Sequence, residues 1–409
     1  TGISTGYIPM YSKIEEEHGV KESDKYTNNL INILMIICTF LVFFSLIFTE
    51  EIVRLFASGF EGETLKLAIK FTRISLFSMY FIGIVSIFTG FLQLKGNYAI
   101  PALIGFPMNF IIILSILISS KTNIFVIAVG SLLGIVSQLL FMWPFIRKSG
   151  YKHKGIINIK DKYIKKMAYI ALPVIVGASV NQINTLVDKT LASSIAVGGI
   201  SALNYAGKLS DSILGLIVST VAAVIYPNMS KMAAKNDMDG LKGTMSESIN
   251  FINILIIPAS IGMMIFAEEF VRLLFGRGAF TEEALVMTTG VFFYYAMGNI
   301  GYGLRQILYR VFYSLQDTKT PMMNASISVF INIILNIILS RYMGLNGLAL
   351  ATSISAIFCL ILLFISIRRK IGPFGMKDIS ISFIKILFAS LVMGILAKLS
   401  YGILIKYVA

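Results

Sequence analysis

The sequence has few of the residues on which soluble enzymes and metalloproteins depend. Of its 409 residues only 14% are charged, and it has 2 cysteines, 2 histidines and 1 tryptophan. Cys38 and Cys359 lie far apart inside apolar runs, which predicts two buried thiols and no disulfide framework. His18 and His153 lie in charged loops, which argues against a metal site built from histidine and cysteine.

The chain is instead rich in long apolar runs. Hydrophobic residues make up 56% of it, more than a soluble domain needs, so lipid is the expected solvent. A helix needs about 20 apolar residues to cross a bilayer, and its backbone must be satisfied internally there. The sequence therefore predicts an all-α polytopic membrane protein, with spans near 25–49, 66–94, 99–119, 123–146, 166–196, 199–226, 247–267, 285–313, 321–340, 346–367 and 380–404.

The net charge of +14 would suggest nucleic acid as the partner of a soluble protein. Here Lys and Arg crowd alternate loops, near residues 13–25, 147–166, 231–242 and 368–377. The positive-inside rule places these loops in the cytoplasm. Their basic side chains are explained by topology and by contact with lipid headgroups, so no nucleic-acid partner is expected.

Part of the sequence returns after a fixed interval. Residues 50–56 (EEIVRLF) come back as 268–274 (EEFVRLL), and 268 − 50 = 218. The same shift relates Pro9, Ser12 and Lys13 to Pro227, Ser230 and Lys231, and slightly larger shifts relate Gln93 and Pro101 to Gln316 and Pro321. Two copies of one membrane unit are typical of transporters.

A period of 218 residues fits six crossings, so the copies are predicted to be parallel six-helix lobes. We expect an N-terminal lobe at 1–150, a C-terminal lobe at 151–370 and an extra C-terminal helix at 371–409. Residue 1 pairs with residue 219, and the first half has no counterpart to residues 165–218. We therefore expect the N-terminal helix and most of the next to be missing from this chain.

Ionisable side chains inside a membrane are costly and usually functional. Asp188, Lys189, Lys208 and Asp211 lie within two neighbouring apolar runs. Lys208 and Asp211 are three residues apart, so they share a helix face and could neutralise each other. The alternative is a cationic surface that faces a water-filled cavity and receives an anionic substrate.

Amide and hydroxyl groups gather in two later spans. Asn332 and Asn336 are four residues apart and share one helix face, and Thr352 and Ser355 lie in the next span. Together with a carboxylate, these oxygens suit a hard cation such as Na⁺. Hydrogen bonding between helices is the alternative. No phosphate-binding glycine loop or catalytic constellation is present in the sequence, so we expect no enzyme.

Several segments resemble one family. Residues 308–321 (LYRVFYSLQDTKTP) resemble the Arg-x-Phe-Tyr-x-x-x-Asp-Thr-Lys/Arg-Thr-Pro loop of the MurJ (MviN) lipid II flippases, and residues 201–206 (SALNYA) resemble their Ser-x-x-x-Tyr-Ala motif. Residues 172–194 and 275–281 fit as well. The resemblance implies the MOP-superfamily fold shared with MATE transporters, with 14 helices in the whole family member, of which this chain holds the end of helix 2 through helix 13.

The resemblance also implies a function. Family members carry the lipid-linked peptidoglycan precursor, lipid II, across the bacterial inner membrane by alternating access, and a cationic cavity receives its pyrophosphate-sugar headgroup. The substrate-binding positions implied here are Lys208, Lys189, Asn204, Tyr205 and Arg310. Lys208 stands where the family has a cavity arginine. This replacement keeps the positive charge but loses the bidentate hydrogen bonding of a guanidinium group.

Some relatives carry a sodium site whose positions fall on Asp188, Asn332, Asn336 and Thr352. Where those relatives have a second acid this chain has Asn336, which should weaken Na⁺ binding. The resemblance thus implies no cofactor, Na⁺ as the candidate coupling ion, lipid II and membrane lipids as partners, and a monomer.

Two other readings remain open. A related exporter would carry O-antigen-type lipid-linked sugars, or cationic drugs in exchange for Na⁺, although a drug antiporter needs acidic groups in its cavity. A polyprenyl-phosphate transferase or a scaffold is the third reading, but Asp317 stands alone in its loop and both histidines are peripheral.

Overall fold

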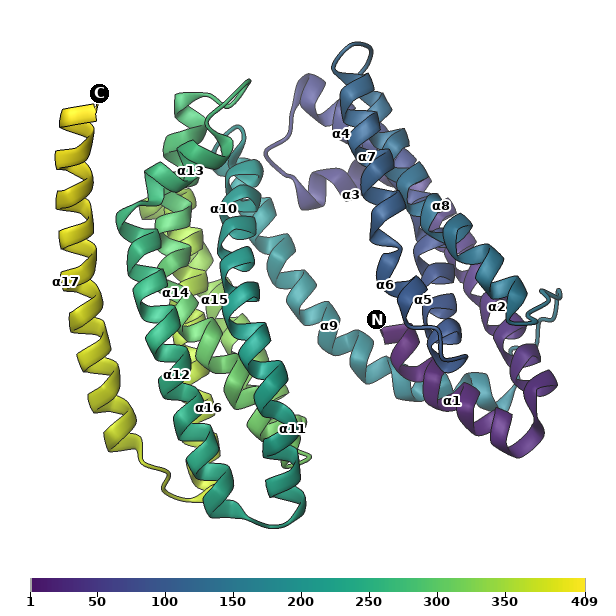
Figure 1. Ribbon diagram of the computed structural model, residues 1–409. Coiled ribbons are helices and arrows are strands. Elements are labelled where there is room, and N and C mark those ends of the chain that lie inside the picture. The colour runs from purple at the N-terminus through teal and green to yellow at the C-terminus, as the bar shows by residue number, and fades with distance from the viewer. Residues whose placement is uncertain (1, 409) are drawn as a thin grey trace. The chain divides into compact units, whose positions relative to one another are not determined.

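The computed structural model describes the backbone of residues 2–408, and all side chains in that range except those of 2–5, 170, 171, 173–178, 180, 181, 219, 223, 407 and 408. Between residues 2 and 408 the regular elements are all helices (Figure 1). The chain forms two compact units, 1–179 and 180–409, which divide inside helix α9 (Lys162–Ile195). The division at residues 150 and 370 expected from the repeat stays a prediction.

The first unit is built around aromatic side chains. Tyr7 and Tyr11 of α1 are fully buried. Tyr7 stacks on Tyr26 of α2, and the rings of Tyr11 and Phe91 of α5 meet edge to face at 5.9 Å. Helices α1, α2 and α5 pack together, α5 also packs on α8, and α7 packs along α8. The elements are α1 (Gly2–His18), α2 (Val20–Ile47), α3 (Thr49–Phe56), α4 (Gly62–Leu76), α5 (Ser78–Leu94), α6 (Ala99–Leu103), α7 (Gly105–Ser119) and α8 (Phe125–Lys148).

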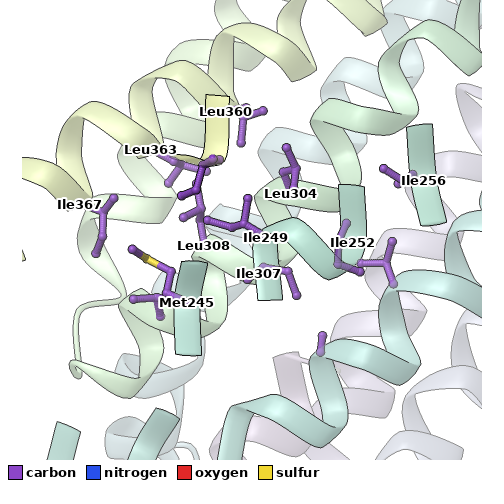
Figure 2. Close-up of a cluster of buried hydrophobic side chains, with 14 of the residues drawn as sticks. Met245, Ile249, Ile252, Ile256, Leu304, Ile307, Leu308, Leu360, Leu363 and Ile367 are labelled. Carbon is purple, nitrogen blue, oxygen red and sulfur yellow. The ribbon is translucent and has the colours of Figure 1, made fainter. Parts of the chain in front are cut away.

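The second unit packs around α14 (Glu282–Ser314), which contacts α10, α11, α12 and α16. Figure 2 shows the main core, where branched side chains of α12, α14 and α16 interleave. The other elements are α10 (Gly199–Leu214), the π-helix η1 (Gly215–Ser219), α11 (Thr220–Ala234), α12 (Met238–Ile265), α13 (Ala267–Phe275), α15 (Lys319–Met343), α16 (Leu345–Ile371) and α17 (Met376–Val408).

Small residues let α14 and α16 approach closely. A Cβ on Gly298 would lie 2.5 Å from the Ser353 Oγ and 2.8 Å from the Ser353 Cα, so no larger residue fits without moving a helix. The Ser353 hydroxyl donates to the backbone carbonyl of Tyr294 at 2.6 Å. Close backbone approach at Gly and Ser is the usual way in which membrane helices associate.

Helix bounds recur between the units at the interval that the sequence predicts. Helices α2 and α12 have 28 residues each and start 238 − 20 = 218 residues apart, and α3 and α13 also start 267 − 49 = 218 apart. Beyond α3 and α13 the shift is 220 residues, as between the starts of α8 and α16, where 345 − 125 = 220. The order of elements therefore repeats.

One detail of the repeat is wrong in the sequence prediction. Gly96 and Gln316 both have positive φ, 76° and 56°, and both close the turn after a long helix. The next residues, Asn97 and Asp317, each accept a backbone N–H three residues on with Oδ1, at 3.3 and 2.9 Å. Gln316 thus corresponds to Gly96 at an offset of 220, and not to Gln93.

Nine helical stretches within the described residues have the length and hydropathy of membrane spans. They coincide with nine of the eleven predicted runs. The other two runs are helical as well, within α9 and α14. Because protein surrounds α14 on several sides, it does not need an apolar surface all round, and it carries Asn, Arg, Gln and Tyr within the run.

Three asparagines of α2 hold the basic loop that follows α8, and we call them the asparagine clamp: Asn28, Asn29 and Asn32. Asn28 donates to the Lys152 carbonyl at 3.2 Å and accepts from the Lys154 N–H at 2.9 Å. Asn29 binds the Asn158 backbone with both ends of its amide, and Asn32 donates to two further loop carbonyls. Side chains of a helix here replace the hydrogen bonds that a loop backbone otherwise takes from water.

The basic loops of the second unit meet at one end. Lys242 Nζ lies 3.9 Å from where a Cβ on Gly372 would be, so the start of α12 and the loop after α16 are neighbours. Lys370 pairs with Asp317 at 2.5 Å, so the loop after α14 lies at the same end of the unit. Burial opposes ionisation of Asp317, but hydrogen bonds from Lys370 and Thr320 outweigh it and lower its pKa to about 2.

Candidate functional site

A chain of polar side chains, which we call the polar ladder, crosses between α9, α15 and α16. Asn336 Nδ2 donates to the Asp188 carboxylate at 2.5 Å and to Asn332 Oδ1 at 3.0 Å. Asn332 Nδ2 donates in turn to Thr352 Oγ1 at 3.4 Å. The structure thus brings together the four residues that the sequence predicts for a cation site. The spacing of 332 and 336 places both amides on one face of α15.

The polar ladder holds oxygens that lack a donor. Asn336 is 0% exposed and Asn332 2% exposed. Asn336 Oδ1 is buried and has no hydrogen-bond partner, and the same is true of Asn184 Oδ1, one turn before Asp188 on α9. A buried acceptor left unpaired costs about 1–3 kcal/mol. Amide and carboxylate oxygens gathered in this way fit a hard cation better than they fit one another.

A cavity of about 400 Å³ lies within the second unit, among α10, η1, α11 and α14. Its wall carries two guanidinium groups, from Arg305 and Arg310, and one carboxylate, from Asp211. A π-helical turn forms part of the wall, and such turns occur frequently at functional sites. The lining consists of Asp211, Leu214, Gly215, Val218, Ala222, Tyr302, Arg305, Gln306 and Arg310.

Aromatic rings position both guanidinium groups. The Arg305 Cζ lies 4.5 Å from the ring centre of Tyr302, and the Arg310 Cζ lies 5.4 Å from that of Tyr226. The Nε atom of each arginine is buried without a hydrogen-bond partner. Among the described residues neither arginine forms an ion pair with a carboxylate. The cavity therefore has positive charge that the protein itself does not neutralise.

Sequence reasoning missed Arg305. The signal was present, because an arginine in the middle of an apolar run is a candidate functional residue by its cost alone. The residues at 302, 305, 306, 309 and 310 also follow the i, i+3, i+4, i+7, i+8 spacing of one helix face. Arg310, which the family motif implied, lies on the cavity wall.

The other implied substrate residues lie elsewhere in the second unit. Lys208, Asn204 and Tyr205 are exposed on α10, and Lys189 is partly buried on α9. The Tyr205 ring packs against Phe275 and Phe280, with ring centres 4.8 and 5.8 Å apart. None of the four is part of the described cavity lining, so their role in binding stays a prediction. No ion pair joins Lys208 to Asp211, so the mutual neutralisation considered above does not form.

The chain is similar to known proteins in sequence and in fold. The sequence model of the family described as "Lipid II flippase MurJ" matches residues 1–408. The chain belongs to the lipid II flippase MurJ family. A probable lipid II flippase MurJ of Vibrio cholerae is 29% identical over 374 residues, which cover 88% of this chain and 71% of that protein. Its counterpart in Thermotoga maritima is 28% identical over 403 residues, 98% of this chain and 79% of that one.

Solved structures agree with the MurJ assignment. The inward closed conformation of a lipid II flippase MurJ superposes with a TM-score of 0.85 at 30% identity, and covers 98% of this chain and 82% of that one. An inward-facing MATE multidrug transporter of the MOP superfamily gives a TM-score of 0.78 at 15% identity, over 91% of this chain and 86% of that one, and shows the fold alone. With its candidate spans, this MurJ-family chain is a multi-pass protein of the bacterial inner membrane.

Proposed function

We propose that the chain carries lipid II across the bacterial inner membrane by alternating access. The observation that carries the proposal is the cavity with two unneutralised guanidinium groups inside an apolar helical unit. Unpaired intramembrane charge is costly and is retained for function. An anionic headgroup that leaves water for such a cavity replaces its hydration with charge-assisted hydrogen bonds.

The residues have different parts in this proposal. Arg310 lies on one wall of the cavity against Tyr226, and there it binds phosphate oxygens of the substrate. Lys208, exposed on α10, attracts the headgroup electrostatically as a point charge. The polyprenyl chain stays in lipid, so only the polar part of the substrate crosses. No covalent bond of the substrate changes, and we propose a transporter that acts as a monomer and not an enzyme.

The polar ladder supports Na⁺ as the coupling ion. Asp188, Asn332, Asn336 and Thr352 would hold the ion, and the unpaired Asn336 Oδ1 fits an oxygen ligand. A bound monovalent cation would neutralise the carboxylate within the membrane. Since ligands bind with different affinity to the two states of a transporter, such an ion could bias the cycle only through that difference.

Rescue of cells depleted of their own flippase tests the function. The whole protein should restore growth and precursor export, and its Lys208→Ala variant should restore them poorly. Lys377→Ala is the matched control, because Lys377 is an exposed basic residue just after the loop that follows α16. The proposal fails if the wild-type protein does not restore export although it reaches the membrane, or if the Lys208→Ala variant works as well as the control.

A drug exporter is disfavoured by the same cavity. A cationic drug would meet two guanidinium groups and one carboxylate on the wall, a net charge of +1. Like charges in a desolvated site repel, so this wall rejects cations. Purified protein should therefore be stabilised against heat by lipid II and not by lipophilic cations such as tetraphenylphosphonium.

A further inference from the structure

Arg305 is the most unusual charged residue of the second unit. It lies within the predicted apolar run of α14, nine residues before the helix ends at Ser314, where a guanidinium group is expensive unless something compensates it. The Tyr302 and Tyr309 rings flank it, with their centres 4.5 and 5.6 Å from its Cζ. Its Nε is buried and unpaired, and no described carboxylate forms an ion pair with it.

Aromatic contacts do not satisfy the N–H groups of this side chain. Two desolvated cation–π contacts of up to about 2 kcal/mol each can offset the about 2.5–3.5 kcal/mol that an arginine costs within a membrane helix on the mildest scales, but they leave Nε buried without a hydrogen-bond partner. Arg305 lines the cavity beside these two rings, whose centres lie 4.5 and 5.6 Å from its Cζ. An arginine fixed in this way is prepared for bidentate contact with a planar or tetrahedral oxyanion.

The geometry points to Arg305 as an anion-binding residue that acts together with Arg310 on one diphosphate group. Both arginines line the same cavity, and so does Gln306. Two guanidinium forks match the two phosphates of a diphosphate better than they match a single carboxylate. This inference rests on the proposed function and names the residues that hold the charged part of that substrate.

The remaining wall fits what is attached to such a diphosphate. Asp211 can only accept hydrogen bonds when ionised, so it would repel an anion but bind hydroxyl or amide donors. A diphosphate joined to a sugar offers both kinds of group. The volume of about 400 Å³ is at the small end of ligand sites, enough for a diphosphate and a sugar ring rather than for a long headgroup.

Ordinary phospholipids share the phosphate chemistry but have one phosphate group. Binding should therefore be measured in nanodiscs of phosphatidylcholine into which lipid II or phosphatidylglycerol is titrated. With the whole protein we expect lipid II to bind, inorganic pyrophosphate to compete with it, and phosphatidylglycerol to bind at least 10-fold more weakly. Equal binding of phosphatidylglycerol would overturn the diphosphate assignment.

Two substitutions test Arg305 itself. Arg305→Met should weaken lipid II binding at least 10-fold and abolish competition by pyrophosphate, and Arg305→Lys should give an intermediate affinity, because the charge remains but the fork is lost. The matched control is Arg341→Met, since Arg341 is exposed at the end of α15 outside the cavity. If Arg305→Met does not fold, Arg305→Lys alone must show weaker lipid II binding and weaker competition by pyrophosphate than wild-type protein.

The outcomes separate this inference from the function on which it rests. Wild-type protein that does not bind lipid II contradicts the proposed function. Wild-type protein that binds lipid II, while Arg305→Met or the folded Arg305→Lys binds lipid II and pyrophosphate unchanged, contradicts the role of Arg305 only. A loss that Arg341→Met shows equally would be a general charge effect and would also contradict it.

Discussion

A second carboxylate at position 336 should strengthen sodium binding to the polar ladder. In the wild-type protein Asn336 Nδ2 donates to Asp188, while its Oδ1 is buried and unpaired. Asn336→Asp places a second negative charge beside the first. Two unit charges about 4 Å apart at an effective dielectric constant of about 20 interact with about 4 kcal/mol. Without a cation this energy is repulsive, whereas a cation between the carboxylates attracts both of them and outweighs their mutual repulsion.

Only part of that energy should appear in affinity. One carboxyl can take up a proton when the site is empty, and that proton must then be displaced. We therefore expect Na⁺ to bind about 10- to 100-fold more tightly to Asn336→Asp than to wild type, equivalent to about 1.4–2.8 kcal/mol. The empty variant should be less stable than wild-type protein, since a donor to Asp188 has been replaced by a repelling group.

Thermal unfolding of purified protein in NaCl and in choline chloride at equal ionic strength measures this effect. A cation at 100 times its dissociation constant adds about 2.7 kcal/mol to stability, so the difference between the two salts should grow in the variant. Asn324→Asp is the matched control, because Asn324 lies on the same helix but pairs with Ser366, at 3.0 Å. An unchanged sodium response in Asn336→Asp, or an equal gain in the control, would refute the reasoning.

Three other substitutions have defined outcomes. Asp317→Asn removes the ion pair with Lys370 but keeps the acceptor of the turn, and it should lower the free energy of unfolding in urea at pH 7 by about 1–2 kcal/mol. Folding lowers the pKa of Asp317 from 3.8 to about 2. The difference in stability between wild type and variant should therefore be complete above pH 4 and vanish as the pH falls to 2. Gly298→Val should lower the melting temperature by driving α14 from Ser353, at a cost of about 1–3 kcal/mol or more. Asn28→Ala removes the bonds to residues 151–154 and should raise amide hydrogen exchange there, with no change in exchange at α17.

The sequence predicts the helices well, because a continuous apolar run of about 20 residues can satisfy its own backbone in lipid only as a helix. The sequence also predicts the repeat. The short amphipathic helix at 50–56 has the same position in its copy as the one at 268–274, so the same residue pattern is needed at both places. The pairing of Gln93 with Gln316 is wrong because it follows side-chain identity. The turn is defined by positive φ, which Gly96 and Gln316 adopt.

The candidate site was partly predictable. The spacing of 332 and 336 predicts that both amides share one helix face, but Asp188, on another helix, was joined to them only by the resemblance to the family. Arg305 was missed because, outside the family motifs, the only charges within apolar runs that the sequence analysis considered were those of the two runs at 166–196 and 199–226. That its Nε lacks a partner could not be read from sequence, since pairing depends on the packing of α10, η1 and α14 around it.

The asparagine clamp has a mechanical consequence. If its backbone were free, the loop after α8 would be a flexible linker that could change conformation without moving the helices on either side. Because Asn28, Asn29 and Asn32 bind that backbone, residues 152–158 belong to the first unit as firmly as a helix does. Residues 152–158 therefore move together with α2 and do not act as an independent flexible segment.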